Sequence, residues 1–212
     1  DTVSIVALSP GEVGAAFKHP DKTYDELAAI KTAELEAAAR AQGVQQVRVL
    51  RFPDTNIANT PELRAAIIDV IRELKPDVVI THWPLDGHPD VRGASQAVVD
   101  ACFFAYLPSI KTAYAPHTVK KVYAFFETAS SESFEPDLCV DISDVIDAKT
   151  AAAACNEAMV AEIKHLFTQN WADIFLGPNR FWGQQSGVKY AEPFKELAVH
   201  GLGKRALQGL PV

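Results

Sequence analysis

The sequence predicts an α/β protein with a mainly parallel sheet, and three observations lead to this fold class. Short β-branched runs alternate with longer helix-like segments, the runs are almost wholly apolar, and helices occupy the connections between successive strands. Strands joined in this way pair in parallel through right-handed crossovers, with both sheet faces covered. The 212 residues suffice for one hydrophobic core. We therefore expect a single domain over residues 1–212.

The first half of the chain is expected to alternate strand and helix. Its strands are predicted over residues 3–8, 47–50 and 78–80, the last buried on both faces. A helix over 24–42 separates the first two strands. Thr60 caps a second helix, which has Pro61 at its first position and runs to about residue 74.

The second half is less regular. The elements expected there are a helix over about 92–106, strands over 119–126 and 138–140, a long helix over 144–165 and a short helix near 192–198. We find no internal repeat or linker, which supports one domain.

Composition excludes several functional classes. Lys and Arg number 20 and Asp and Glu 27, so the net charge of −7 argues against a nucleic-acid or anionic-membrane partner. No apolar run approaches the roughly 20 residues of a membrane span, and no signal segment precedes the first strand. The three cysteines form no CxxC motif. These features predict a cytoplasmic protein.

Polar side chains gather in the loops that follow the first three strands, where ligands bind to parallel α/β sheets. Glu12 follows the first strand and Asp54 the second. The third strand leads into residues 81–90, which hold two histidines and two aspartates: His82, Asp86, His88 and Asp90. Such a density indicates an active site, whereas an ordinary loop whose aspartates cap the next helix remains the alternative.

Two charged residues of the first helix are expected on its apolar face. At 100° per residue, Lys31 and Glu34 fall within the stripe that contains Leu27. They form either a buried structural ion pair or a pair that reaches the site floor or a subunit interface. The same alternatives apply to Lys149 and Asn156 of the later helix.

The ordered motifs resemble those of the LmbE-like (PIG-L) deacetylases over nearly the whole chain. The segments that carry the resemblance are Gly11-Glu12-x-Gly14, Ile30-Lys31-x-x-Glu34-Leu35, Phe52-Pro53-Asp54, Thr81-His82-Trp83-Pro84, Asp86-Gly87-His88-Pro89-Asp90, Val140-Asp141-Ile142-Ser143 and Gly187-x-x-Tyr190-Ala191-Glu192. The resemblance implies a Rossmann-like three-layer sandwich. It also implies zinc-dependent hydrolysis of N-acetyl groups on amino sugars or glycoconjugates, in a homotrimer or homohexamer.

The resemblance further implies roles for individual residues. His88 would stabilise the oxyanion or assist the leaving group, and Asp90 would orient its ring. The secondary or substrate-binding positions would be Glu12, Lys31, Glu34, Asp54, His82 and Asp86.

This sequence departs from the family at its metal ligands. Two of them come from a His-Pro-Asp-Asp motif on an N-terminal strand and helix that precede the part of the family that this chain matches. The third is the last residue of a His-Pro-Asp-His motif, where Val91 stands here and has no lone pair for zinc. Because the preceding strand is central in the family, its absence would leave apolar edges exposed.

Three functions follow as alternatives. We expect an impaired or noncatalytic deacetylase homologue that retains the sugar site. An active metal-dependent deacetylase would need replacement ligands from the 81–90 segment. A binding or assembly subunit with a Rossmann-like fold would recognise something other than an acylated sugar.

Overall fold

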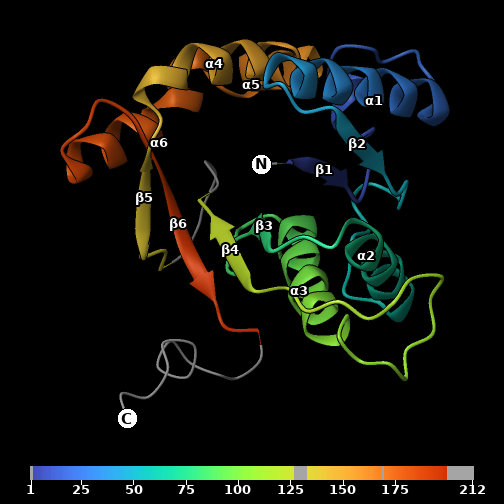
Figure 1. Cartoon of the computed structure of the whole chain (residues 1–212). Helices are drawn as coiled ribbons and strands as arrows, with labels where there is room; N and C mark the ends of the chain where they lie inside the picture. Colours follow the sequence, from blue (N-terminus) through green and yellow to red (C-terminus); the bar gives the residue numbers. More distant parts are fainter. Residues whose placement is uncertain (1, 127–132, 169, 200–212) are drawn as a thin grey trace. The chain divides into compact units, whose positions relative to one another are not determined.

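The computed structural model describes residues 2–126, 133–168 and 170–199 (Figure 1). The chain divides into two compact units, each made of two separate stretches. The first unit contains residues 1–57 and 139–192, and the second contains residues 58–138 and 193–212. The expectation of one domain is not tested by this division and stays a prediction.

The first unit opens with the parallel strands β1 (Ser4–Ala7) and β2 (Gln46–Val49), which helix α1 (Tyr24–Ala41) connects. A capping box fixes where α1 begins. The Thr23 hydroxyl accepts the Glu26 N–H at 3.3 Å, and a Glu26 carboxylate oxygen accepts the Thr23 N–H at 2.9 Å. These elements confirm the strands and the helix predicted for this stretch.

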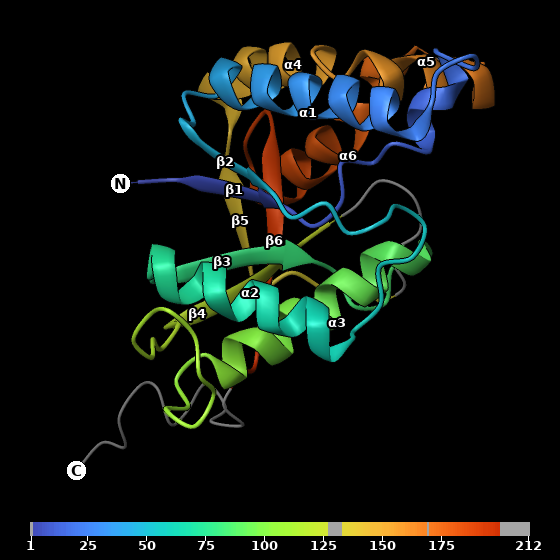
Figure 2. The same ribbon diagram turned by 90° about the vertical axis from the view of Figure 1, so that its right-hand side faces the viewer.

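Two helices, α4 (Ile146–Ala154) and α5 (Glu157–Leu166), lie where one long helix was expected. The break follows from Asn156, whose side-chain oxygen accepts the Met159 N–H at 3.3 Å and starts a new helix. Helix α4 lies along α1 (Figure 2), and α5 packs on the 3₁₀ turn η1 (Gly14–Phe17). Three buried side chains form a small core of this unit: Ala15, Leu27 and Ala158.

The sequence does not predict helix α6 (Trp171–Ser186), because its interior holds residues that usually break helices. Those residues are Gly177, Pro178 and Gly183. Gly183 is needed where it stands, since a Cβ there would lie 2.7 Å from the backbone oxygen of Lys189. Close packing against the following segment therefore accounts for this glycine.

The second unit is built on strands β3 (Val78–His82), β4 (Lys121–Phe125) and β6 (Ala191–Leu197). Strand β3 pairs with β4 in parallel, and β4 pairs with β6 in antiparallel fashion. The full strand order is β3-β4-β6-β5, and β5 (Leu138–Asp141) belongs, apart from Leu138, to the first unit. The helix expected near 192–198 is wrong, because β6 takes its backbone partners from β4, which is remote in sequence.

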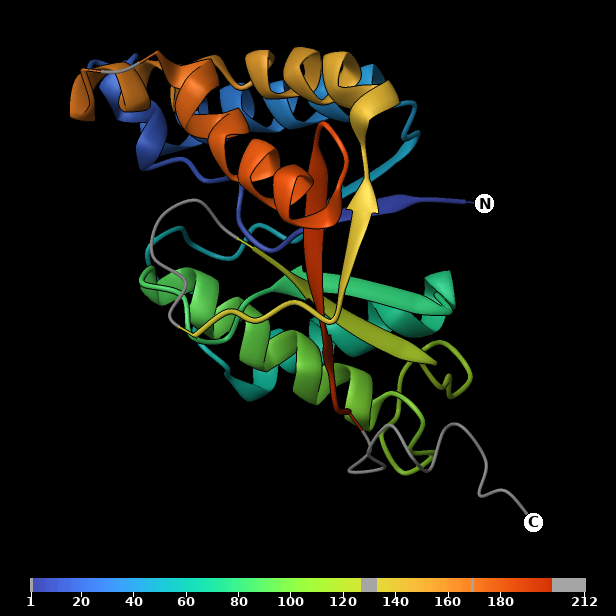
Figure 3. The same ribbon diagram turned by 90° about the vertical axis from the view of Figure 1, so that its left-hand side faces the viewer.

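Helices α2 (Pro61–Leu74) and α3 (Pro89–Phe104) complete the second unit. Thr60 caps α2 as predicted, accepting the Leu63 N–H at 3.2 Å. Helix α3 packs on β3 and β4 (Figure 3). The best-buried apolar side chains of this unit include Leu63, Ala97, Ala101, Cys102 and Val122. Within the described residues, no helix is long and apolar enough to cross a membrane.

Strand β3 is not buried on both faces, contrary to the prediction. Val78 is 47% and Ile80 57% exposed, whereas Thr81, on the opposite face, is 5% exposed. Strand β3 also ends the order of its sheet and, in the described part of the chain, pairs only with β4. In the described residues, β1 and β2 pair with each other as a two-stranded sheet.

Candidate functional site

The 81–90 loop of the second unit begins at His82, the last residue of β3. The His82 ring packs on Phe125 of the neighbouring strand, with centroids 4.9 Å apart. Its carbonyl accepts the Ser95 hydroxyl of α3 at 2.8 Å. The strand end is thus fixed to the helix that follows the loop.

Asp86 organises the middle of the loop from a buried position. Its carboxylate oxygen Oδ1 accepts the His88 N–H at 2.8 Å, and the residue is 3% exposed. The Arg92 guanidinium donates to the carbonyl oxygens of Asp86 and Gly87, both at 2.8 Å. The sequence analysis did not single out Arg92. A cation in the first helical turn after a capping histidine could have indicated that it holds the loop. Together these bonds hold His88 in a defined position.

His88 is the N-cap of α3, and this role fixes its proton. Its Nδ1 accepts the Asp90 backbone N–H at 3.2 Å. A neutral imidazole that accepts at Nδ1 carries its proton on Nε2. The exposed ring therefore has an N–H donor available to a ligand. In the structure, a backbone group of Asp90 makes this contact, and the catalytic roles assigned to both residues stay predictions.

The donor atoms of this loop do not suit the zinc ion that the resemblance implies. Two of its possible metal-binding atoms, Nδ1 of His88 and Oδ1 of Asp86, already accept backbone N–H groups, and Val91 has no metal-binding atom. Nowhere in residues 2–126, 133–168 and 170–199 do three or more His, Cys, Asp or Glu side chains gather as metal ligands. The described residues by themselves therefore do not fit a catalytic zinc site.

Glu12 and Asp54 meet in the first unit, in the loops that follow β1 and β2. A Glu12 carboxylate oxygen accepts the Asp54 N–H at 3.1 Å, and Asp54 in turn accepts the Val13 N–H at 2.9 Å. The Ser9 hydroxyl donates to the other Glu12 oxygen at 3.2 Å. Both carboxylates thus fix loop backbone. Their predicted part in substrate binding remains a prediction.

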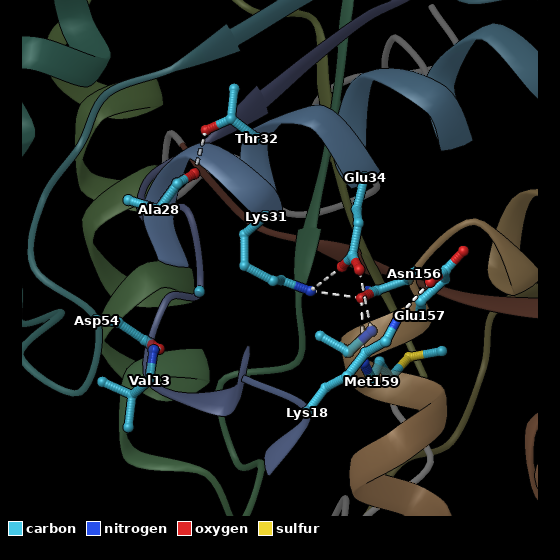
Figure 4. A network of polar contacts seen from close by, with 12 residues as sticks. Val13, Lys18, Ala28, Lys31, Thr32, Glu34, Asp54, Asn156, Glu157 and Met159 are labelled. Carbon is cyan, nitrogen blue, oxygen red and sulfur yellow. Dashed lines mark hydrogen bonds and ion pairs between the residues drawn. The ribbon is translucent and has the colours of Figure 1, made fainter. Parts of the chain in front are cut away.

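Lys31 and Glu34 form the predicted ion pair, with Nζ 3.2 Å from Oε2 and both side chains nearly buried, at 12% and 11% exposure. Figure 4 shows Lys31 directed at both Glu34 and Asn156, whose side-chain oxygen accepts a second Nζ–H. The remaining Glu34 oxygen accepts the Ala158 N–H at 3.0 Å. The pair joins α1 to the start of α5. The substrate-binding part predicted for Lys31 and Glu34 stays a prediction. Lys149 likewise forms an ion pair, with Glu192.

The structure thus brings the predicted residues together in three groups. Glu12 lies with Asp54, and Lys31 lies with Glu34, both in the first unit. The third group, in the second unit, consists of His82, Asp86, His88 and Asp90.

Comparison with known proteins gives concordant results. Residues 1–102 match the family model described as PIG-L: GlcNAc-PI de-N-acetylase. The diacetylchitobiose deacetylase of Thermococcus kodakarensis is 32% identical over 199 residues, which cover 90% of this chain and 70% of that protein.

Solved structures agree with the sequence matches. The conserved protein TT1542 from Thermus thermophilus superposes with a TM-score of 0.76 at 28% identity, over 93% of this chain and 82% of that one. The N,N'-diacetylchitobiose deacetylase from Pyrococcus horikoshii gives a TM-score of 0.74 at 20% identity, over 93% of this chain and 84% of that one. The latter likeness concerns the fold alone.

Proposed function

This chain belongs to the PIG-L (LmbE-like) deacetylase family, and on that premise we propose that residues 1–212 bind an N-acetylated amino sugar without holding a catalytic zinc ion. The first part rests on the relatives, which are deacetylases of such sugars. The second rests on the donor atoms of the 81–90 loop. The trimeric or hexameric state, the cytoplasmic location and the single domain likewise stay predictions.

One observation carries the proposal. His88 presents an exposed Nε2–H, while its Nδ1 accepts the Asp90 N–H. Val91, the residue after Asp90, has no metal-binding atom. An imidazole N–H held in this way is a hydrogen-bond donor suited to the carbonyl oxygen of an acetamido group. The residue can therefore recognise the acetyl group, and no hydrolytic step is assigned to it.

The proposal is tested on the purified chain after zinc has been added in excess and dialysed away. We expect far less than one zinc per chain by atomic emission, and no release of free amine from N,N'-diacetylchitobiose above the buffer rate. Calorimetry should detect saturable binding of N-acetylglucosamine. His88→Ala should weaken that binding about fivefold, the effect of one lost hydrogen bond. His165→Ala, at an exposed histidine of α5, serves as the control.

Other results would select one of the alternatives. Stoichiometric zinc with turnover that a chelator abolishes would establish an active deacetylase with replacement ligands. Failure to bind any N-acetylated sugar, in a chain that stays folded and assembles stably, would favour the assembly subunit. Equal affinities of the two histidine variants would remove His88 from the binding site.

A further inference from the structure

A pocket of about 350 Å³ lies beside helix α3, within the second unit, and Pro84 of the 81–90 loop and Ser95 are part of its lining. The residues that line this α3 pocket include Asn59, Pro84, Gln96, Val99, Asp100 and Leu197. Its volume is at the lower end of the range of ligand sites and suits a single six-membered ring with its substituents. The polar and apolar residues of its lining decide which ligands it favours.

One wall is polar and held in place before any ligand arrives. The Asn59 side-chain amide donates to Oδ2 of Asp100 at 2.8 Å. Arg64 donates to the amide oxygen of Asn59 at 2.7 Å and to its backbone carbonyl at 2.9 Å. Because both ends of the Asn59 amide are engaged, the Asp100 carboxylate is fixed in orientation.

Hydrogen-bonding capacity remains on this wall. Within the described residues, Oδ1 of Asp100 receives no protein donor, and the Gln96 amide has no protein partner. A carboxylate oxygen accepts from O–H or N–H⁺ groups and repels anions. The lining also includes the apolar side chains of Pro84, Val99 and Leu197, which suit C–H groups.

We propose that the α3 pocket binds a small hydroxylated ring that is neutral or carries an amine, with its donors on Asp100 and Gln96. A sugar or amino-sugar ring combines such donors with an apolar C–H face. The sugar class rests on the proposed function, whereas the preference for donors over anions rests on Asp100 alone. The pocket is thus a second saccharide subsite that does not involve His88.

Glucosamine is the probe, and glucuronate is its anionic counterpart. Glucosamine should shift the side-chain amide NMR signals of Asn59 and Gln96 in a saturable manner, and glucuronate should not. Asp100→Asn keeps an acceptor for Asn59, so the fold is retained, and should weaken glucosamine binding about tenfold. Asp69→Asn, the same charge change on the exposed side of α2, should leave it unchanged.

The outcomes separate this proposal from the proposed function. If Asp100→Asn binds glucosamine as the parent chain does, or if glucuronate shifts the same amides, the α3 pocket is not the site inferred here. In His88→Ala, the amide shifts caused by glucosamine should persist. If the amide shifts persist in His88→Ala and N-acetylglucosamine also binds this variant as it binds the parent chain, the proposed function fails, whereas the proposal for the α3 pocket is retained. If His88→Ala abolishes them, the pocket is not a separate subsite.

Discussion

The Glu34 carboxylate of α1 accepts the backbone N–H of Ala158, in the first turn of α5, at 3.0 Å. A residue 124 positions away in the sequence thus provides part of the N-terminal cap of this helix. Lys31 bridges Glu34 and Asn156, the second capping group, so one buried cation stabilises both. These contacts between α1 and α5 explain why Lys31 and Glu34 lie on the apolar face of α1.

Glu34→Ala should destabilise the protein by about 3 kcal/mol, because it leaves Lys31 buried without its counterion and Ala158 without its acceptor. Urea unfolding measures the loss. Glu36→Ala on the same helix, where the pair with Arg40 is 3.8 Å long and exposed, should change stability by no more than about 0.5 kcal/mol. Similar losses of unfolding free energy in the two variants would show that the Glu34 contacts stabilise the protein no more than an exposed ion pair does.

Gly183→Ala should cost about 2 kcal/mol, since the added Cβ would lie 2.7 Å from the Lys189 backbone oxygen. Gly177→Ala is the matched control in the same helix, where a Cβ would meet nothing within 4 Å. It should leave stability within about 1 kcal/mol of the parent chain. Equal melting temperatures for the two variants would contradict the close approach of α6 to the 189–190 segment.

The thiol of Cys102 should be inert in the folded protein, because burial raises its pKa to about 12. At pH 8 only about one Cys102 in ten thousand would be a thiolate. A disulfide exchange reagent should therefore label Cys102 only after unfolding, while the half-buried Cys139 and Cys155 are more accessible. Loss of a rapidly reacting thiol in Cys102→Ala would disprove this.

Glu26 should give α1 a dependence on acid pH. The hydrogen bond from Lys22, followed by those from Thr23, lowers the pKa of Glu26 from 4.5 to about 2. Because the folded-state pKa is the lower one, the stabilisation is fully present above about pH 4.5 and is lost as the pH falls towards 2. Carbon NMR titration of the carboxyl should show its pKa raised in Lys22→Met and retained in Lys22→Arg. An unchanged pKa in the first variant would reject Lys22 as the main cause.

Elements that carry their own boundary chemistry could be predicted from the sequence. Helix α2 has Thr60 and Pro61 at its start, and the α1 segment is followed by Gly43. These signals act within a few residues, so no knowledge of the fold is needed to interpret them. The break between α4 and α5 is different, because the Ala-rich segment favours one helix and the groups that cap the second include Glu34 of α1.

In the candidate site, too, only the features that depend on local sequence could be predicted. Helical periodicity places Lys31 and Glu34 together, and the loop after β3 contains His88, all from local spacing. That Nδ1 of His88 caps α3, and that Arg92 holds the loop, depends on backbone geometry that residue types do not specify. The positions of these residues in the sequence thus indicated that they are of interest. Their hydrogen-bond partners could be identified only from the folded structure.

The division of the first unit between residues 1–57 and 139–192 has a consequence for synthesis of the chain. Residues 1–57 leave the ribosome before residues 139–192 have been translated, so Lys31 and Glu34 of α1 are first surrounded by water. At roughly 5–20 residues per second, the intervening stretch takes on the order of ten seconds. During that interval β1 and β2, whose two-stranded sheet is marginal on its own, lack the helices α4 and α5 that pack on α1 and η1 in the folded unit. The first stretch therefore completes its packing only after α4 and α5 have been translated.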